Sequence, residues 1–246
     1  MRVAELQEMY ELEDSYWWFV GRRRMVRRLI RTYAPAGRPL RILDAGCGTG
    51  GTMEMLADWG EIHGCDLSHN ALTMCRARGD WALSCSSVEA TPYPDAHFDV
   101  VVSADVLEHV ADDARAMGEM VRVLRPGGLL VAAAPAHMWL WSEHDDALGH
   151  LRRYSRRQFR ALVEGAGLRT KKLTEAVALA LPAVLMYRGV RRLTRRAERP
   201  KTSLVRLPSV LNRLLIGLLD IENALLPYLS LPLGTSLVCA AVKPGQ

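Results

Sequence analysis

Glycines at alternate positions mark the stretch whose residue types and spacing most clearly indicate chemistry. Residues 41–51 read Arg-Ile-Leu-Asp-Ala-Gly-Cys-Gly-Thr-Gly-Gly, so an apolar run leads into Gly46, Gly48 and Gly50. Because glycine has no Cβ and tolerates positive φ, such a loop lets the backbone approach a ligand closely. The pattern predicts a buried strand over 42–45 and a helix over 52–59. A nucleotide-like ligand is expected at the turn between them.

Two ligands compete for this turn. Gly46, Gly48 and Gly51 also fit the GxGxxG spacing of dinucleotide-binding folds, and Asp66 fits the ribose-binding acid of that fingerprint. Asp44 stands directly before the loop, where it would repel a pyrophosphate that needs bare N–H groups and the positive end of a helix. The same carboxylate suits a cofactor that carries an ammonium and a sulfonium. This charge argument favours S-adenosylmethionine over NAD.

The stretch resembles the first motif of a known family, the class I S-adenosylmethionine-dependent methyltransferases, in the residues Leu43-Asp-Ala-Gly-Cys-Gly-Thr-Gly50. The similarity continues in the family's order through Gly64-Cys-Asp-Leu-Ser68, Ser86-Ser-Val-Glu89, the long segment 92–110 with Leu107-Glu-His-Val110, and Leu124-Arg-Pro-Gly-Gly128. The resemblance implies an α/β fold with a doubly wound, mostly parallel, seven-stranded, Rossmann-like sheet. It also implies an N-terminal helical lid and a cofactor at the carboxyl ends of the strands.

The resemblance distributes the cofactor contacts over the strand ends. Asp66 is expected to accept the ribose hydroxyls, because a carboxylate can take two donors, and Leu67 to pack on the adenine. Ser87 replaces the acid usual in the family, so the backbone of Ser87 and Val88 is the expected adenine contact. The predicted cofactor-binding residues are Asp44, Gly46, Cys47, Gly48, Gly50, Asp66, Leu67, Ser87, Val88, Ala104, Trp18 and Arg23.

Trp17, Trp18 and Phe19 are consecutive aromatics in the N-terminal segment, which is predicted to be helical over 1–34. Trp17, Trp18 and Phe19 cannot all lie on one helix face, so at least one should cover something else. In the resembled family this segment often lids the cofactor. Trp17, Trp18 and the pair Arg22-Arg23 are then expected to contact the methionine or a substrate carboxylate. Packing of these aromatics on the core stays open as an alternative.

The loop over 136–155 is too long and too rich in Trp, His and Asp for a plain connection. His144 and His150, together with His109 from the preceding motif, are the candidate general bases. The expected substrate-binding residues are Trp17, Trp139, Trp141, Asp145, Arg153 and Tyr154. The spacing of His144, Asp145 and His150 also suits a metal, but two histidines with loop carboxylates indicate a metal only weakly, and none is expected.

Strands and helices alternate along the chain, which predicts a βαβ series and a parallel sheet. Further strands are expected over 61–67, 81–86, 98–103, 129–134, 168–174 and 235–242. Ser68 is the expected N-cap of a helix over 70–78, residues 124–128 are expected to end another helix, and a third is expected over 156–165. The expected division is a lid (1–36), a cofactor-binding core (37–175), an insertion (176–234) and a last core strand (235–246).

The insertion is the segment most particular to this chain. Its first part places arginines from Arg188 to Arg199 at helical spacing on one face, and its second part carries a leucine stripe over 210–219. Such a pair predicts an apolar cap over the acceptor pocket or a peripheral membrane contact through 184–230. Packing on the sheet, with or without a homodimer partner, is the alternative. Charges and prolines interrupt every apolar run before about twenty residues, so neither part is expected to span a bilayer.

The whole chain has 246 residues, 49% of them apolar and 24% charged, which suits one large domain with an insertion. Its five cysteines form no CxxC pair, and this predicts reduced thiols in a cytoplasmic protein, with peripheral membrane association left open. The acidic N-terminus is not expected to be a signal peptide. The formal charge of +5 is modest, but the arginines are clustered.

These patterns together predict a methyltransferase that acts on a small-molecule or lipid-like acceptor at oxygen, nitrogen or carbon. The transfer is expected to be in line and to leave S-adenosylhomocysteine. Residues 103–105 lack the Asn/Asp-Pro-Pro-aromatic signature of enzymes acting on exocyclic amines, so no nucleic-acid partner is expected. Three rivals remain: a nucleic-acid methyltransferase, a nicotinamide-dependent oxidoreductase, and a membrane-associated S-adenosylmethionine-binding protein without transfer activity.

Overall fold

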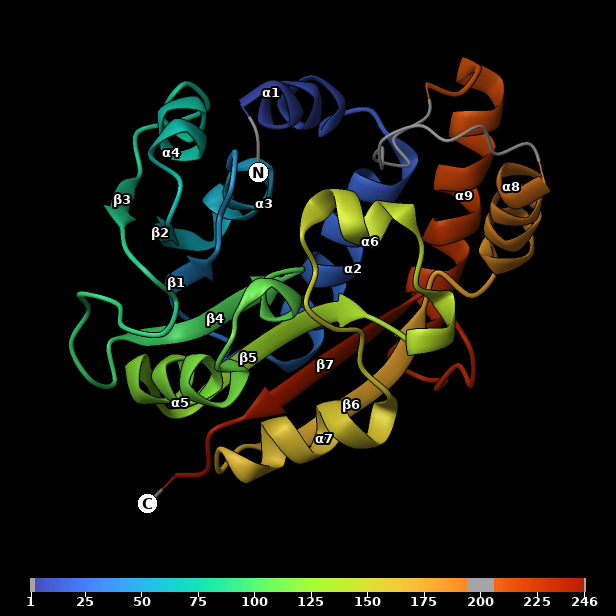
Figure 1. Ribbon diagram of the computed structural model, residues 1–246. Coiled ribbons are helices and arrows are strands. Elements are labelled where there is room, and N and C mark those ends of the chain that lie inside the picture. The colour runs from blue at the N-terminus through green and yellow to red at the C-terminus, as the bar shows by residue number, and fades with distance from the viewer. Residues whose placement is uncertain (1–2, 194–205, 246) are drawn as a thin grey trace.

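A seven-stranded sheet forms the centre of the computed structural model, which describes residues 3–193 and 206–245 (Figure 1). The strands lie in the order β3 (Ala82–Cys85), β2 (Gly60–Asp66), β1 (Leu40–Ala45), β4 (Phe98–Ala104), β5 (Leu124–Pro135), β7 (Ser236–Val242) and β6 (Arg169–Ala176). The first five pair in parallel, and β7 runs antiparallel to both of its neighbours. The predicted fold class, a mostly parallel seven-stranded sheet, is confirmed.

Helices cover both faces of this sheet. The helical segments are α1 (Val3–Leu12), α2 (Trp17–Tyr33), α3 (Gly51–Leu56), α4 (His69–Arg76), α5 (Asp113–Val123), α6 (Glu143–Leu148), α7 (Arg156–Gly165), α8 (Leu181–Leu193) and α9 (Ser209–Leu225), with 3₁₀ turns η1 (Ala57–Trp59), η2 (Leu107–His109) and η3 (Met138–Leu140). Side chains of α2, α3, α4 and α9 share one apolar cluster with the sheet, whereas α5 and α7 share the other. Figure 1 shows α5 and α7 together on their side of the strands.

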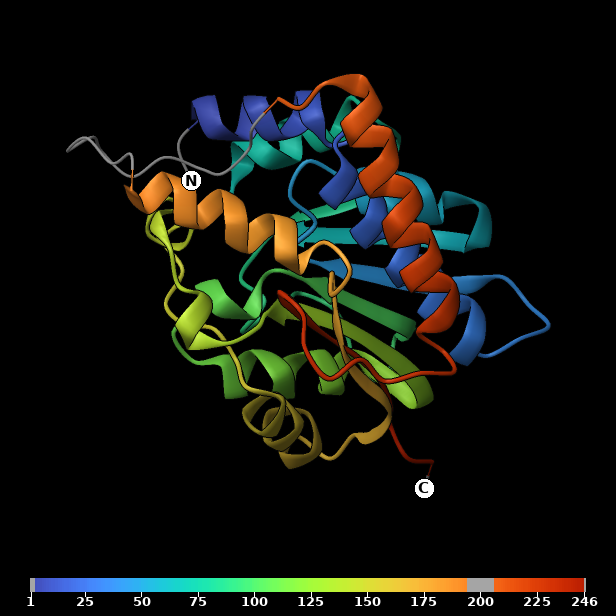
Figure 2. The ribbon, with the colours of Figure 1, turned by 90° about the vertical axis from the view of Figure 1, so that its right-hand side faces the viewer.

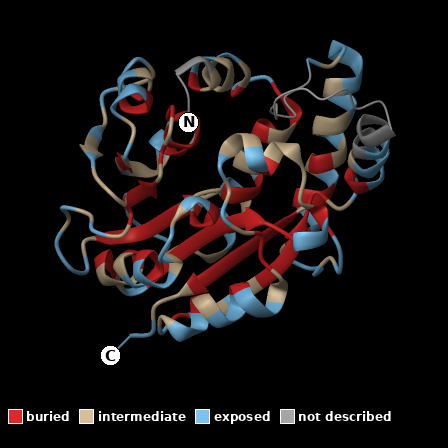
Figure 3. Ribbon diagram, viewed as in Figure 1, coloured by how far each residue is buried: buried red, intermediate tan, exposed pale blue. Residues whose placement is uncertain are grey.

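The middle strands are buried from both sides (Figure 3). Val100 and Val102 of β4 belong to the cluster under α2, and Val101 between them belongs to the cluster under α5. Alternation along a strand sends successive side chains to opposite faces, so a continuous valine run suits a strand with helices on both sides. The sheet therefore gives the strand ends a rigid base.

Local boundaries differ from the predicted ones in three places. The predicted helical segment 1–34 is split into α1 and α2 by a turn over 13–16. Strand β5 begins at Leu124, five residues before the predicted start, because Leu124 already pairs with Phe98 of β4. The predicted loop 136–155 contains α6, whose first turn is closed by a capping box between Ser142 and Asp145.

The insertion between β6 and β7 packs against the N-terminal segment. Asn223 of α9 donates from Nδ2 to the Gly21 carbonyl of α2 at 2.9 Å. A Cβ on Gly21 would stand 2.2 Å from the Leu219 Cδ1, so a larger residue here would force the Leu219 side chain to shift. Figure 2 shows α9 lying along α2.

Glu222 joins the two halves of the insertion. Its carboxylate accepts N–H groups from Val177 and, at 2.8 and 3.0 Å, from Ala178 and Leu179, just before α8 begins. The predicted arginine face, from Arg188 to Arg199, lies outside the residues whose side chains are described. Within the described ranges, the helices are all too short or too polar to cross a lipid bilayer.

Candidate functional site

The glycine loop after β1 has the backbone that only glycine adopts without strain. Gly46, Gly48 and Gly50 have φ of 82°, 54° and 90°. A Cβ at Gly46 would stand 2.4 Å from Val106, and one at Gly50 would stand 2.6 Å from the Cys75 sulfur. The loop therefore presents bare backbone at the carboxyl end of β1, as its sequence predicts.

Asp66 ends β2 next to this loop. Its Oδ2 accepts the Gly48 N–H at 3.0 Å and its Oδ1 accepts the Ser68 N–H at 2.8 Å. Ser68 caps α4 by accepting the Ala71 N–H at 3.2 Å, as expected for that residue. Leu67, the next side chain along the chain, is 72% exposed. An acceptor carboxylate and an uncovered apolar side chain thus flank the glycine loop.

Asp44 lies beneath the loop and is almost fully buried. Burial raises its pKa to about 7, and the Arg22 guanidinium nearby opposes that shift. Without a bound cationic ligand, the Asp44 carboxyl group is therefore only about half ionised near neutral pH. A positively charged ligand would favour the ionised form.

Arg22 crosses the strand ends from α2. Its Nη1 forms an ion pair with Asp105 and donates to the Ala104 carbonyl at 3.4 Å, while the guanidinium lies 4.8 Å from the Trp18 ring centroid. Asp105 has a positive φ of 58°, which turns the chain sharply after β4. Trp18 and Arg22 thereby cover the ends of the strands. The cleft between them and β5 holds only about 10 Å³, room for a single water.

Trp17 and Arg23, two residues of the N-terminal segment with predicted contacts, have protein partners of their own. Trp17 belongs to the core, and its backbone N–H donates to the Asn212 side chain of α9 at 2.9 Å. It packs the fold and has little surface for a substrate. Arg23 pairs with Asp14 at 3.3 Å, so Arg22, its neighbour in the predicted pair, is the arginine that reaches the strand ends.

Glu13 lies against the glycine loop, although the sequence reasoning gave it no role. It is 4% exposed, and its carboxylate accepts the Thr49 hydroxyl. The residue comes from the turn between α1 and α2, which brings it across the loop. No spacing signal near Glu13 indicates this contact, because it depends on how the turn folds back.

The predicted acceptor loop contains a buried ionic network. Asp145 is fully buried and accepts from Arg153 Nε at 2.7 Å and Nη2 at 3.1 Å. It also lies 2.9 Å from His150 Nδ1 and accepts the Ser142 N–H at 2.8 Å. These contacts hold its pKa well below the usual range despite burial. Asp145 and Arg153 bind each other, and the substrate-binding roles predicted for them stay predictions.

Tyr154 and the two loop tryptophans have separate environments. Tyr154 is buried and its hydroxyl donates to Asp113 at 2.7 Å, and its predicted substrate contact stays a prediction. Trp141 donates from Nε1 to Asp146 at 2.9 Å. Trp139 is 56% exposed and has surface to offer an acceptor.

The structure brings the candidate bases together beside the end of β4. The rings of His109 and His150 lie 4.7 Å apart at 82°, and the ring of His144 lies 6.3 Å from that of His150. Burial, together with His150, lowers the pKa of His109 to about 4. Glu108 is fully buried beside both rings, and the sequence reasoning gave it no role. Its position next to His109, in the motif Leu107-Glu-His-Val110, was the sequence signal that could have indicated a role for Glu108.

The remaining predicted cofactor residues lie at or under the same edge. Val88 is buried, and Ser87 accepts the Glu89 N–H on its hydroxyl at 3.1 Å. Cys47 is buried inside the glycine loop, where hydrogen bonding with Cys75 and burial raise the pKa of its thiol. Ala104 ends β4.

Comparison with known proteins places this edge in a family. Residues 43–132 match the family model of a methyltransferase domain. A probable S-adenosylmethionine-dependent methyltransferase of Mycolicibacterium smegmatis is 33% identical over 159 residues, which cover 63% of this chain and 60% of that protein. A demethylmenaquinone methyltransferase of Renibacterium salmoninarum is 35% identical over 120 residues, covering 48% and 51% of the two chains. The chain thus spans less than two thirds of these relatives.

Solved structures show the same fold. A methyltransferase in complex with the Trm112 methyltransferase activator of Haloferax volcanii aligns with a TM-score of 0.65 over 99% of this chain and 96% of its own, at 19% identity. The matched residues 43–132 include the glycine loop, Asp66 and the segment that follows β4. Residues 43–132 thus match a methyltransferase domain, and the chain is similar in sequence and fold to class I S-adenosylmethionine-dependent methyltransferases.

Proposed function

We propose that this chain transfers the methyl group of S-adenosylmethionine to a small or lipid-like acceptor. One observation carries the proposal: two chemically different groups meet at adjacent strand ends. The glycine loop and Asp44 stand at the end of β1, and the histidines 109 and 150 lie beside the end of β4, which pairs directly with β1. A cofactor held by the first group has its reacting end near the second.

The residues around the loop fit this cofactor. The glycines leave a cradle that a Cβ would fill, Asp66 offers a carboxylate for hydroxyl donors, and Leu67 is uncovered for an adenine. Asp44 suits a cationic amino acid end, because a positive charge would relieve the cost of its burial. These four features support S-adenosylmethionine as the ligand of this edge.

The chain contributes positioning and exclusion of water. When bound, the cofactor supplies an electrophilic methyl group on a sulfonium. Trp18 and Arg22 close the strand ends, and a closed site favours a reaction in which charge disappears. Alignment of nucleophile, methyl and sulfur can lower such a barrier by up to about 7 to 11 kcal/mol.

His150 is the base that the geometry supports. Its Nδ1 is engaged with Asp145, so the opposite ring nitrogen, Nε2, carries the lone pair for an acceptor proton. His109, with a pKa of about 4, is a poor proton acceptor near neutral pH. The ring of His144 lies 6.3 Å from the His150 ring, farther than the ring of His109 at 4.7 Å.

Apolar surface near these histidines supports a lipid-like acceptor. Met138, Trp139 and Leu151 are 55%, 56% and 54% exposed on the segment that carries His150. The Renibacterium relative is named for demethylmenaquinone as its acceptor. An apolar ring compound with a short polar edge fits this combination of surface and histidines.

The outer face of α9 supports contact with a membrane surface that would deliver such an acceptor. Val210, Leu214 and Ile221 are 61%, 65% and 59% exposed along one stripe, and Arg206 and Arg213 are exposed near its start. An apolar stripe bordered by arginine suits an anionic bilayer. Flotation with anionic vesicles should be lost in Leu214→Asp. A stable dimer that buries this stripe would contradict the membrane contact.

Cofactor binding and turnover test the proposal directly. Calorimetry should show uptake of S-adenosylmethionine and S-adenosylhomocysteine, and Asp66→Ala should weaken both by at least about tenfold, since it removes a charge-assisted hydrogen-bond acceptor. Asp58→Ala, an exposed acid on η1, is the matched control. Incubation with a demethylated quinol should give a product heavier by one methylene. Uptake of NAD without S-adenosylmethionine, or methylation of RNA alone, would overturn the proposal.

A further inference from the structure

Glu108 is a buried carboxyl group to which the proposed methyl transfer gives no chemical role. Its side chain has no solvent exposure, and neither carboxyl oxygen has a hydrogen-bond partner among the residues that the structure describes. Leaving a buried polar group without a hydrogen-bond partner destabilises the folded state by about 1 to 3 kcal/mol, and by more if the group is charged. Such a group indicates a ligand that the polypeptide itself does not supply.

The nearest positive charges do not satisfy it. Arg22 forms its ion pair with Asp105, and Arg153 forms its own with Asp145. Both arginines influence Glu108 only at a distance, and burial dominates, so the pKa of this carboxyl is raised well above its ordinary value. A neutral, unpaired carboxyl group here would destabilise the fold, with no contact to offset the loss.

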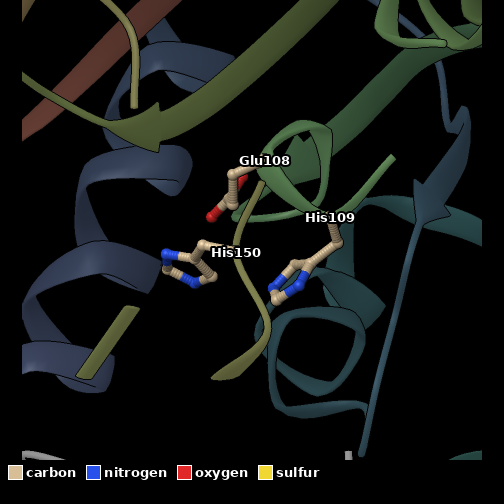
Figure 4. Close-up of side chains that lie close together, drawn as sticks. All are labelled: Glu108, His109 and His150. Carbon is tan, nitrogen blue, oxygen red and sulfur yellow. The ribbon is translucent and has the colours of Figure 1, made fainter. Parts of the chain in front are cut away.

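Two histidines face this carboxyl group. Each of the three residues Glu108, His109 and His150 offers one ligand atom, and these atoms lie within 4.8 Å of one another. Figure 4 shows the carboxylate and the two rings turned toward a common space. Two imidazoles and one carboxylate form a ligand set that binds divalent transition ions such as Zn²⁺ and leaves positions open for other ligands.

The surroundings of His150 resemble the support of a metal ligand. Asp145 holds its Nδ1 at 2.9 Å, which leaves Nε2 as the ring nitrogen available to a metal ion. Asp145 is fixed in turn by Arg153 and Ser142. A carboxylate behind a histidine sets the tautomer and ring orientation that a metal requires.

Backbone contacts hold the three residues in place. Leu151, next to His150, donates its N–H to the Glu108 carbonyl at 2.8 Å. The Tyr154 hydroxyl also lies 3.2 Å from the Leu107 carbonyl oxygen. The turn η2 and the loop after α6 are therefore joined, so the ligand set is formed before any ion arrives.

We propose that Glu108, His109 and His150 bind one divalent transition-metal cation, whose open positions hold an oxygen of the methyl acceptor. This inference rests on the proposed methyl transfer and narrows its acceptor to a hydroxyl or enol. The cation lowers the pKa of that hydroxyl, so its proton leaves to water and His150 need not accept it. The new O–CH₃ bond forms as the C–S bond breaks, and the electron pair returns to sulfur.

Metal binding by the full chain gives a test that does not depend on turnover. Protein stripped with a chelator and dialysed is titrated with Zn²⁺, and Co²⁺ is added separately to record visible absorption. We expect one tight equivalent and a Co²⁺ spectrum of low coordination number. Glu108→Gln, which keeps the shape of the side chain, and His150→Ala should each weaken Zn²⁺ binding at least about 100-fold.

The matched control is His69→Ala, because His69 is an exposed histidine at the start of α4. It should bind Zn²⁺ as tightly as the parent chain. Binding of S-adenosylhomocysteine is measured on every variant to verify the fold. Zn²⁺ affinity that is absent from the parent, or unchanged in Glu108→Gln, would overturn the metal site.

The outcome separates this proposal from the proposed function. If S-adenosylhomocysteine binds and methyl transfer proceeds unchanged in chelator, the metal proposal is wrong and His150 acts as the base. If neither the cofactor nor its product binds, the proposed methyl transfer itself is wrong. If the chelator abolishes transfer and Zn²⁺ restores it, both proposals are supported.

Discussion

The two neighbouring strand ends that form the site are built in different ways. At β1 the site is formed mainly by backbone conformation. Glycines with positive φ turn the chain, and Asp66 accepts the Gly48 N–H. At β4 and the loop over 137–155 the side chains do the work, through Asp145, His150 and Glu108. The first site depends on local conformation, and the second depends on contacts between distant segments. Substitutions should therefore damage the two regions by different mechanisms.

The largest loss of stability is expected in the side-chain region. Asp145→Asn leaves the buried Arg153 without its charge partner, which should cost about 3 to 5 kcal/mol of unfolding free energy. Asp146→Asn is the control, because Asp146 only accepts from Trp141 near the surface and should cost less than about 0.5 kcal/mol. Denaturant unfolding measures both. Equal stability of the two variants would contradict the view that this loop depends on a buried ion pair.

The backbone region should respond most strongly at Gly46. Gly46→Ala combines a left-handed φ of 82° with a Cβ only 2.4 Å from Val106, so about 3 kcal/mol and most cofactor affinity should be lost. Gly149→Ala has φ of 71° but open space around its Cβ and should cost only the conformational strain, about 1 to 2 kcal/mol. Thermal unfolding and calorimetry with S-adenosylhomocysteine check the pair. Normal binding by Gly46→Ala would mean that the loop does not contact the cofactor.

Cofactor affinity should depend on pH through Asp44. Burial raises its pKa to about 7 in the free protein, and a bound cation favours the ionised carboxylate and so lowers that pKa. Protonation therefore competes with binding: affinity should be level above pH 7 and fall about tenfold per unit below it. Calorimetry between pH 5.5 and 8.5 measures this slope. Asp44→Asn should bind more weakly and lose this slope, and a slope kept in that variant would assign it to another group.

The smallest effect is expected at a helix cap beside the loop. Ser68→Ala removes the acceptor for the Ala71 N–H and should cost about 1 kcal/mol. Asn70→Ala, exposed on the same helix, should change stability by less than about 0.5 kcal/mol. Denaturant midpoints compare the two variants. A cap effect without a change in cofactor affinity would show that α4 supports the loop only through stability.

Local signals predicted the sheet well because each of them depends only on residues that are close together in the sequence. The valine run of β4, the glycine loop after β1 and the cap at Ser68 each depend on residues a few positions apart. Such signals survive whatever the rest of the chain does, because backbone conformation and strand burial follow from short-range sterics and apolar pattern. The order of the parallel strands follows from the family resemblance that these motifs carry.

The sequence did not predict which candidate site residues are buried, because long-range contacts decide the surroundings of a side chain. Trp17, Arg153 and Tyr154 have residue types suited to substrate binding, yet each is buried against a partner from another element. No periodicity shows that Trp17 would meet Asn212, nearly two hundred residues along the chain. Burial, and not residue type, determined which of these groups can meet a ligand.

By itself the amino-acid sequence determined the doubly wound sheet, the glycine loop and the acids at the ends of β1 and β2, because these depend on short-range backbone preferences and apolar pattern. Only the tertiary structure selected Arg22 as the arginine at the strand ends and collected Glu108, His109 and His150 around one space. The physical reason is that the polarity, charge and accessibility of a side chain are set by neighbours that folding brings from elsewhere in the chain.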